Sequence, residues 1–337
     1  MGHDVTRRQQ LAWCFGAAGV PVMLLCAAAS WHWALAAGAC ALLYYTIVWK
    51  LWVRAGDQQS LAMLARRQLG KTGAVVLIAA ALWTVTALAD TARRSAAAFP
   101  GGAEAALCGT VLLALCAWGG ARGTQVLGRA VAVLAPVLAG IHAVFLISAL
   151  KQVRLAWCAP WGDASQLLRL TPALLLPSAA LFLQRTPGSG KMPAAMLSVL
   201  ALAPAVFAAV TSGCLSPAVA QDDGLPFYTL SKSLSLLGVM ERLEPLVSAV
   251  LYLSFFCLGA LLTQAAATML AAAFQDERLG QGAMPVAVCA AAFGLTFLPE
   301  GIPAWLANGG AAIFWGIVPL AILLVVLAKK EAKKRKK

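Results

Sequence analysis

The sequence predicts an all-α polytopic membrane protein with about ten transmembrane helices, arranged as two halves of five helices each. Three observations support this fold class. Hydrophobic residues make up 61% of the 337 residues and charged residues only 12%, whereas soluble domains carry about 25% charged residues. The mean hydropathy is +0.81. Two apolar stretches, the first and the sixth, are interrupted by glycine or proline, which is typical of the paired broken helices of transporters.

The first predicted span covers residues 11–29 and contains the interruption Gly16-Ala17-Ala18-Gly19-Val20-Pro21. Two glycines and a proline within six residues weaken a helix at mid-depth in the membrane. Because ordinary membrane helices also tolerate these residues, a simple kink and a true unwound break both remain open.

The next four predicted spans complete the first half of the chain. A basic loop separates the second from the third, and it contains Lys50, Arg54, Arg66, Arg67 and Lys71. The fifth span contains His142, which could be a proton relay. Since no acidic residue lies in the same segment, we favour a hydrogen-bonded packing role. The four spans cover residues 33–53, 72–88, 105–118 and 126–150.

The sixth predicted span, 167–183, is short and carries Pro172 and Pro177 followed by Ser178, which makes it the second interrupted helix. A loop with Asp222 and Asp223 follows the seventh span. The seventh, ninth and tenth spans are expected at about 192–212, 284–298 and 305–327, and the eighth in the uncharged run of some thirty positions that follows Glu244.

An amphipathic helix is predicted before the eighth span, over residues 226–240. Apolar residues at helical spacing alternate with Ser, Thr and Lys there, as in helices that lie along a membrane or cap a cavity. The charged residues Glu241, Arg242 and Glu244 follow directly. They could form an ion-paired gate or coupling surface, or they could be a solvated helix start, since acids and Pro245 suit a first turn.

The charge distribution predicts the topology. If loops alternate between the two sides, most of the 26 Lys and Arg residues fall on the side of both termini, which places both termini in the cytoplasm and the Asp222–Asp223 loop outside. The basic tail 329–337 reads as a lipid-facing anchor rather than a nucleic-acid-binding arm, so no nucleic acid partner is expected.

The sequence contains no motif that indicates an enzyme or a metal site. The nine cysteines form no C-x-x-C pair and read as small buried hydrophobes, not as a metal site or disulfide framework. The H-E-x-x-H and G-x-S-x-G motifs are absent, and Gly188-Ser189-Gly190-Lys191 lacks the other residues of a phosphate-binding loop. We therefore expect a protein that is not an enzyme and uses no cofactor.

Three short motifs, in order, carry a family resemblance. Leu69-Gly70-Lys71 precedes the third span, residues 122–129 (RGTQVLGR) open the fifth, and a serine-bearing hydrophobic helix precedes Glu241-Arg242-Leu243-Glu244. In this order they resemble the spore germination permeases, the B-subunits of GerA-type germinant receptors. The resemblance extends over nearly the whole chain. The position of Pro245 directly after the last motif departs from the family pattern.

The resemblance implies membership of the amino acid–polyamine–organocation superfamily and a LeuT-like fold. This fold has two inverted five-helix repeats, here residues 9–150 and 166–328, with interrupted helices 1 and 6. The resemblance further implies a location in the spore inner membrane, binding of a small nutrient such as an amino acid, and partner receptor subunits. It favours the coupling role for Glu241, Arg242 and Glu244.

A ligand site is expected at midplane, where interrupted helices free backbone groups to bind a carboxylate and an ammonium. Gly16 and Gly19 would let the backbone approach the ligand, with Pro177 and Ser178 facing them. Trp83 and Thr86 on the third span, and Tyr252 and Ser254 on the eighth, are candidates to shape the side-chain pocket, with plain packing as the alternative for these four residues.

Two functions remain from the sequence. One is a nutrient sensor that signals to partner subunits, and the other is an active amino acid permease or ion-coupled symporter. A scaffold that has lost ligand binding is a more distant third. Because sensing and transport would use the same pocket, the sequence does not separate them.

Overall fold

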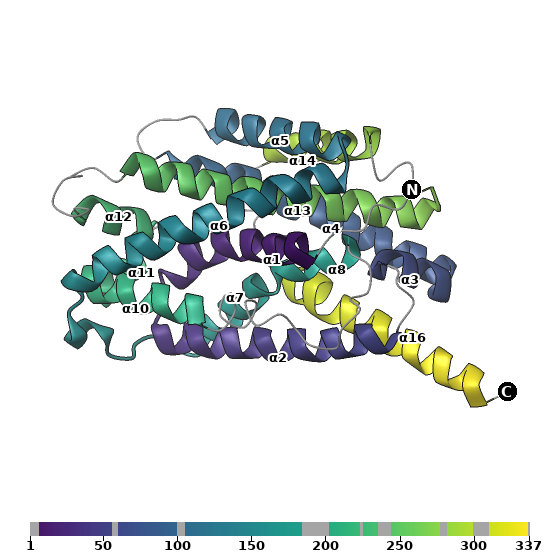
Figure 1. The fold of residues 1–337 in the computed structure, drawn as a ribbon, viewed down its shortest axis with the longest axis horizontal. Coiled ribbons are helices and arrows are strands. Elements are labelled where there is room, and N and C mark those ends of the chain that lie inside the picture. The colour runs from purple at the N-terminus through teal and green to yellow at the C-terminus, as the bar shows by residue number, and fades with distance from the viewer. Residues whose placement is uncertain are drawn as a thin grey trace.

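A computed structural model of the chain describes residues 7–55, 60–99, 105–183, 202–222, 225–234, 244–276, 282–298 and 310–335. Within these ranges the chain forms helices joined by turns, without a strand. The longer helices run roughly along one common axis and lie side by side in an elongated bundle (Figure 1).

The first half of the chain begins with a helix that changes its winding. Helix α1 is followed directly by a π-helical segment, η1, and the next long helices are α2, α4, α5 and α6. The bounds are α1 Arg7–Pro21, η1 Val22–Cys26, α2 Trp31–Ala55, α3 Leu61–Leu69, α4 Lys71–Arg94, η2 Ser95–Ala98, α5 Ala105–Ala121, α6 Thr124–Ala149, η3 Leu150–Gln152 and η4 Leu155–Cys158.

The second half begins with another helix that changes its winding, this time through a 3₁₀ segment, η5. The bounds are α7 Ser165–Leu174, η5 Leu176–Ala179, α8 Ala180–Leu183, α10 Ala203–Leu215, α11 Pro217–Asp222, α12 Pro226–Ser233, α13 Glu244–Phe274, α14 Ala283–Thr296, η8 Ala312–Ile317 and α16 Val318–Arg335.

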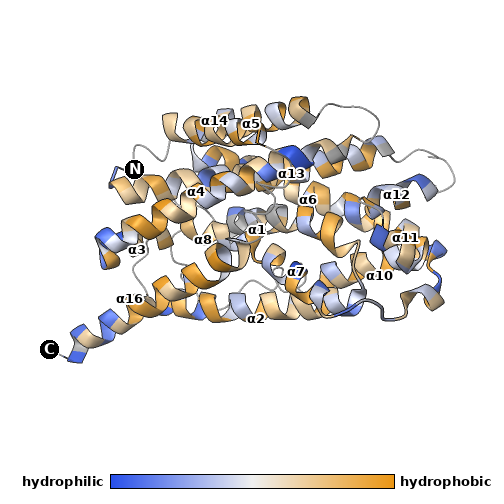
Figure 2. Cartoon of the chain, turned by 180° about the vertical axis from the view of Figure 1, so that it is seen from behind, coloured by the Kyte–Doolittle hydropathy of each residue, from blue (hydrophilic) through white to orange (hydrophobic). Residues whose placement is uncertain are grey.

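Among the described residues, six helical stretches are long and apolar enough to cross a membrane, and three apolar helices are shorter. Polar residues gather toward the two ends of the bundle, and hydrophobic residues cover most of the length between them (Figure 2). The chain is therefore a polytopic all-α membrane protein, and the count of ten spans stays a prediction. The six stretches are Trp31–Ala55, Lys71–Arg94, Thr124–Gln152, Ser165–Leu183, Pro245–Phe274 and Ala312–Lys333.

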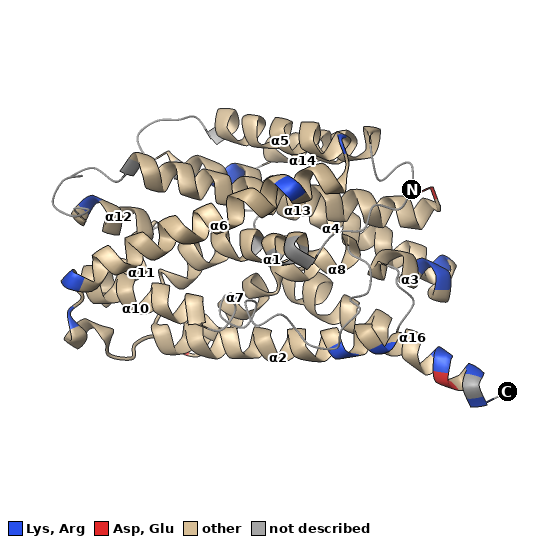
Figure 3. Ribbon diagram, viewed as in Figure 1, with Lys and Arg blue, Asp and Glu red and all other residues tan. Residues whose placement is uncertain are grey.

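Lys and Arg residues concentrate at the end of the bundle formed by α3, the end of α2 and α16 (Figure 3). Lys329 donates a hydrogen bond to the carbonyl of Gln68 at 2.6 Å, and Lys330 donates one to the carbonyl of Ala55 at 3.0 Å. Such an excess of cations at one end is the charge pattern of a cytoplasmic face. The orientation itself stays a prediction.

The basic segment between the second and third spans is not a simple loop, because most of it forms helix α3. The Ser60 side chain caps this helix by accepting a hydrogen bond from the Met63 N–H at 3.3 Å, and Gly70 with φ 62° ends it. Leu61 and Leu64 are buried. Arg66 and Arg67 therefore lie on a helix that packs against the bundle.

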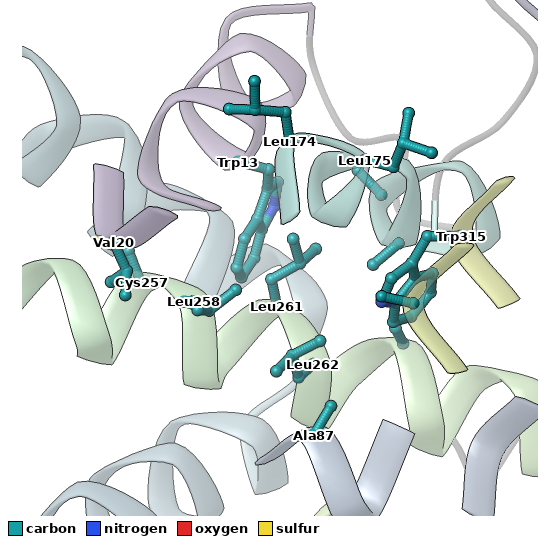
Figure 4. Packing of buried hydrophobic residues seen from close by; sticks show 14 of the residues in the cluster. Trp13, Val20, Ala87, Leu174, Leu175, Cys257, Leu258, Leu261, Leu262 and Trp315 are labelled. Carbon is teal, nitrogen blue, oxygen red and sulfur yellow. The ribbon is translucent and has the colours of Figure 1, made fainter. Parts of the chain in front are cut away.

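Helix α13 forms the centre of the bundle and packs against α1, α4, α5, α6 and α14. Its buried Gln264 joins two neighbouring helices: its amide nitrogen donates to the Gly120 carbonyl, and its amide oxygen accepts from the Thr124 hydroxyl, both at 3.0 Å. Figure 4 shows Leu258, Leu261 and Leu262 of α13 packed among side chains from several other helices.

Both predicted interruptions are present, although the first lies later than expected. Gly16 and Gly19 belong to the α-helical part of the span, and the winding changes only after Pro21. The helical backbone at Gly16 packs closely against α13, where an added Cβ would come within 2.7 Å of the Cys257 Cβ. The change in helix winding that was expected at Gly16 to Gly19 therefore occurs later, in the π-helical segment that begins at Val22.

The predicted amphipathic helix 226–240 is described as far as residue 234, and its helical part, α12, ends at Ser233. The side chains of Phe227 and Leu230 are buried in the protein. This part of the segment therefore packs onto the bundle, and its position along the membrane or over a cavity stays a prediction. Residues 235–240 lie outside the described ranges.

Candidate functional site

The two interrupted spans face one cavity of about 540 Å³, called the main cavity below. Pro21, Leu24 and Leu25 line it from the first span, and Pro172, Ala173 and Leu176 line it from the sixth. Helices α4 and α13 form the remaining walls, together with Ala311 beside η8. Ligand pockets typically measure about 300–1,000 Å³, so this cavity is large enough for a small organic molecule.

Charged groups of both signs line the main cavity. Asp90 and Arg94 of α4 form an ion pair at 2.8 Å, and their side chains are 14% and 37% exposed. Arg169 of α7 also lines the cavity and is exposed. Among the described residues, Arg94 and Asp90 make the one salt bridge, so Arg169 has no acidic partner there. The lining therefore carries one more positive than negative charge.

The first turn of α7 is held by an acidic side chain. Asp163 accepts hydrogen bonds from the hydroxyl and the backbone N–H of Ser165. The Ser165 hydroxyl is the main reason that the pKa of Asp163 lies below its ordinary value. Ser30, just after η1, is tied to the same region, because its N–H donates to the Gln166 side chain at 3.0 Å and its hydroxyl accepts from the Trp161 N–H at 3.2 Å. The end of the first span and the start of the sixth are thereby held together.

Carbonyl groups at the breaks are bound by side chains of neighbouring helices. Tyr45 donates to the Leu175 carbonyl at 3.0 Å, beside η5. The Trp315 carbonyl in η8 accepts from the Tyr44 hydroxyl at 2.7 Å and from the Ser178 hydroxyl at 2.8 Å. Irregular backbone inside a membrane is stable only when its polar groups are bound in this way.

A second cavity of about 190 Å³ lies on the other side of the first span, and we call it the His142 cavity. It is enclosed by α1, η1, α6, α10 and α13, and its lining is apolar apart from His142 and Ser254. The His142 Nδ1 lies 2.6 Å from the Leu138 carbonyl oxygen, and its Nε2 lies 2.8 Å from the Met23 sulfur. Both ring nitrogens of His142 therefore contact other atoms of the protein.

The structure divides the predicted ligand-binding residues between several places. Trp83 lines the main cavity, where its ring stacks on Phe314 with centroids 5.1 Å apart. Gly16, Gly19 and Ser254 line the His142 cavity instead.

Four of the predicted residues line neither cavity. The Thr86 hydroxyl donates to the carbonyl of Trp83 in its own helix at 2.7 Å. Pro177 and Ser178 are buried in η5, with Ser178 bound to η8. Tyr252 points to α5, where its hydroxyl donates to the Cys108 carbonyl at 3.0 Å.

Of the predicted coupling residues, Glu244 is the first residue of α13, while Glu241 and Arg242 lie outside the described residues. The sequence analysis above did not single out Asp90, Arg94 or Arg169, which line the main cavity. An acid and a base four residues apart at the end of an apolar run are a signal that could have singled out the pair.

No protein-family model matches the chain, and no curated protein sequence matches it either. Solved structures do match. One is Mhp1, a nucleobase-cation-symport-1 family transporter, in a closed conformation with bromovinylhydantoin bound. Its TM-score is 0.62 at 14% identity, with 90% of this chain and 75% of that chain covered. Another is MhsT in complex with L-phenylalanine, with a TM-score of 0.50 at 13% identity, covering 96% of this chain and 100% of that chain.

At such low sequence identities, the similarity to these two structures shows a shared fold and nothing further. Both neighbours are LeuT-fold transporters, and this chain therefore has a transporter-type fold. Transporters of this fold bind small substrates such as amino acids. The LeuT-like fold expected from the resemblance thus agrees with the solved structures.

Proposed function

We propose that the chain binds a small nutrient, an amino acid, in the main cavity. The observation that carries this proposal is the position of the cavity between both interrupted spans, with α4 and α13 completing its walls. In proteins built from inverted repeats with paired broken helices, the substrate site lies near the bilayer midplane at the repeat interface. The proposal includes ten spans in two inverted five-helix repeats, 9–150 and 166–328.

The charges of the main cavity suit a zwitterion. Arg169 is available to bind a carboxylate, and guanidinium groups bind carboxylates through two parallel hydrogen bonds. The Asp90 carboxylate lies in the same lining and can accept a hydrogen bond from an ammonium group. The apolar residues between them, with the Trp83 ring, would hold the side chain of the nutrient.

Backbone atoms would complete the site. Pro172 has no N–H, so the carbonyl of Leu168 lacks its α-helical donor, and both residues line the main cavity. We retain Gly16 and Gly19 in the site as the part of α1 that lets this helix lie close to α13, behind the lining residues. Pro177 and Ser178 would fix the shape of the second break through the bond from Ser178 to η8.

A binding assay tests this assignment on the full chain in lipid nanodiscs. One or a few of the standard L-amino acids should raise the unfolding temperature, since a ligand that binds only the folded state stabilises it. Leu25→Trp, which would fill the main cavity, should abolish the rise. Val137→Trp on the exposed face of α6 is the matched control and should retain it. An unchanged rise with Leu25→Trp, or no rise with any amino acid, would contradict the proposal.

The finer proposal is that the chain is the permease-like subunit of a spore germinant receptor in the spore inner membrane, with both termini cytoplasmic. The motif order given above supports it. Glu241, Arg242 and Glu244 would couple the nutrient site to partner subunits, because they lie just before and at the start of α13. This helix lines the main cavity with Phe255, Leu258 and Leu262.

Affinity purification from spore membranes tests the receptor role and should recover the two other types of receptor subunit. Arg242→Ala should leave nutrient binding intact and abolish the germination response, whereas Arg154→Ala, a basic residue stacked on Trp157, should change neither. Recovery of this chain alone, with normal germination of spores that lack it, would refute the receptor role.

One observation favours a second candidate function, an ion-coupled permease. Asp90 is a carboxylate in the lining of the main cavity, and intramembrane acids commonly bind coupling ions or protons. Uptake of a labelled amino acid into proteoliposomes that depends on an ion gradient, and is lost in Asp90→Asn, would support this candidate over the sensor.

A further inference from the structure

His142 stands between two atoms that can only accept hydrogen bonds. Its Nδ1 lies 2.6 Å from the Leu138 carbonyl oxygen, and its Nε2 lies 2.8 Å from the Met23 thioether sulfur. A neutral imidazole has one N–H donor and one nitrogen lone pair, so it can donate to only one of these partners. The other nitrogen would then direct its lone pair at an acceptor. A protonated imidazolium donates to both.

The surroundings of the ring also suit a cation. The rings of Phe207 on α10 and Phe227 on α12 lie with centroids 5.5 Å and 6.0 Å from that of His142. Aromatic faces attract cations at such distances. Taking a charged ring out of water costs free energy, and the contacts with the carbonyl, the sulfur and the aromatic rings reduce this cost.

No other described residue in the lining of the His142 cavity carries a titratable group. The elements packed around it do carry such groups, but these point elsewhere. Tyr228 and Lys232 of α12 stack on each other, and Tyr252 of α13 binds α5. The other described titratable side chains on these elements are Cys26, Arg129, Cys214 and Cys257, none of which lines the cavity. A pH response of this cavity is therefore assigned to His142.

Met23 connects this histidine to the break in the first span. It belongs to the π-helical segment Val22–Cys26, and its next two neighbours, Leu24 and Leu25, line the main cavity. A contact between Met23 and α6 therefore fixes the position of the segment that forms one wall of the main cavity.

We propose that His142 is a proton-binding site that couples protonation to the conformation of the interrupted first span. A proton from solvent binds the lone pair of Nε2, and the new N–H donates to the Met23 sulfur, which holds η1 against α6. Loss of the proton removes this bond and releases η1. Acidic conditions thus favour the conformation seen here, and the effect on a nutrient in the main cavity rests on the proposed function.

Nitrogen NMR of the full chain with ¹⁵N-labelled histidine, in lipid nanodiscs, tests the proton site directly. The chain has three histidines, so His142→Gln assigns the signal. At about pH 5 both ring nitrogens of His142 should carry a proton, and at about pH 8 only one should. Met23→Leu keeps the volume and removes the acceptor, so it should reduce the protonated fraction at every pH. Met269 is a buried methionine on α13 that does not line the His142 cavity, so Met269→Leu is the matched control and should leave the titration of His142 unchanged.

Labelling of an introduced cysteine tests the coupling. Leu24→Cys should react with a charged methanethiosulfonate reagent at different rates at the two pH values, after normalisation to Leu168→Cys on α7, which lines the same cavity and is exposed. His142→Gln and Met23→Leu should each abolish this difference.

Two results would overturn the proposal: a His142 ring that keeps a single proton throughout the pH range, or a labelling difference that persists in His142→Gln. Neither measurement needs a nutrient, so failure of the proposed nutrient site would appear separately, in the amino acid assay.

Discussion

The two cavities share two walls, the first span and helix α13, and differ in size and charge. The main cavity measures about 540 Å³ and contains Asp90, Arg94 and Arg169. The His142 cavity measures about 190 Å³ and is apolar except for Ser254 and the histidine itself. Pro21 lines the main cavity and Gly19 lines the His142 cavity, so the first span separates a charged cavity from an apolar one.

This difference shows how an interrupted helix can serve two purposes. On the charged side, the interrupted span lines a cavity together with charged side chains of α4 and α7, which are of the kind that bind a polar ligand. On the apolar side, small residues and one titratable ring decide how firmly the same segment is held. Substitutions on the two sides of the first span test this difference between the cavities.

The largest effect is expected for Gly310→Ala, next to η8. A Cβ on Gly310 would overlap the indole of Trp83, a lining residue of the main cavity. The ring must move, and overpacking of this kind costs about 3 kcal/mol at the upper end of its usual range. In nanodiscs, the variant should unfold at a lower temperature and bind the amino acid more weakly. Gly140→Ala on α6, where a Cβ meets open space, is the control and should be neutral or slightly stabilising.

The two shared walls can be tested with the two glycines of α1. Gly16→Ala places a Cβ 2.7 Å from the Cys257 Cβ and should lower the free energy of unfolding by about 1–2 kcal/mol. Gly19→Ala places a Cβ 3.5 Å from the Ser254 hydroxyl, an ordinary contact, and should change stability by less than about 1 kcal/mol. Thermal unfolding of the two variants side by side decides this. Equal losses would show that α1 is not packed against α13 as described.

Arg169→Gln tests the charged side. A hydrogen bond to a charged group contributes about 1.5–3 kcal/mol, so amino acid binding should weaken by about tenfold or more. The loss should shrink at high salt, because the arginine is exposed. Arg154→Gln, a basic residue that lines neither cavity, should bind as the parent does. Equal affinity of both variants would remove Arg169 from the site.

The smallest effect is expected for Ser165→Ala at the start of α7. The Ser165 hydroxyl keeps the pKa of Asp163 below its ordinary value. The ionised form of Asp163 therefore contributes stability above about pH 4, which is lost as pH falls through the lowered pKa. The variant should lose this contribution and show a slightly flatter decline of unfolding temperature in acid. A decline as steep as that of the parent would mean that Asp163 does not titrate through this contact.

Much of the fold could be predicted from the sequence because a bilayer imposes length and polarity on each helix. The apolar runs located the long helices, and Pro172 with Pro177 located the second break. Helix α3 was missed although its signals are local: Ser60 at the start, two arginines in the last turn and Gly70 after it. The first break was placed one turn too early, because Gly16 packs against α13 and its helical bonding survives there.

The candidate site was harder to predict, because its residues depend on which face of each helix points to the cavity. Helix α13 is apolar and two thirds of its most apolar window is buried, so periodicity could not tell that Ser254 and Tyr252 point to different neighbours. The pairing of His142 with Met23 joins residues 119 positions apart, and no local pattern reports such a contact. Arg169 and Asp90 meet in one cavity only through the packing of α7 against the other helices.

The bonds between distant helices also bear on how the chain is made. The Tyr44 hydroxyl and the Ala55 carbonyl, both on α2, find their partners in Trp315 and Lys330, which are 271 and 275 residues further along the chain. When α2 leaves the ribosome, none of these partners has been synthesised. Helix α2 must therefore enter the membrane with these polar groups bound to something else, such as water, lipid headgroups or the insertion machinery. The final hydrogen bonds of α2 form only after translation has reached α16.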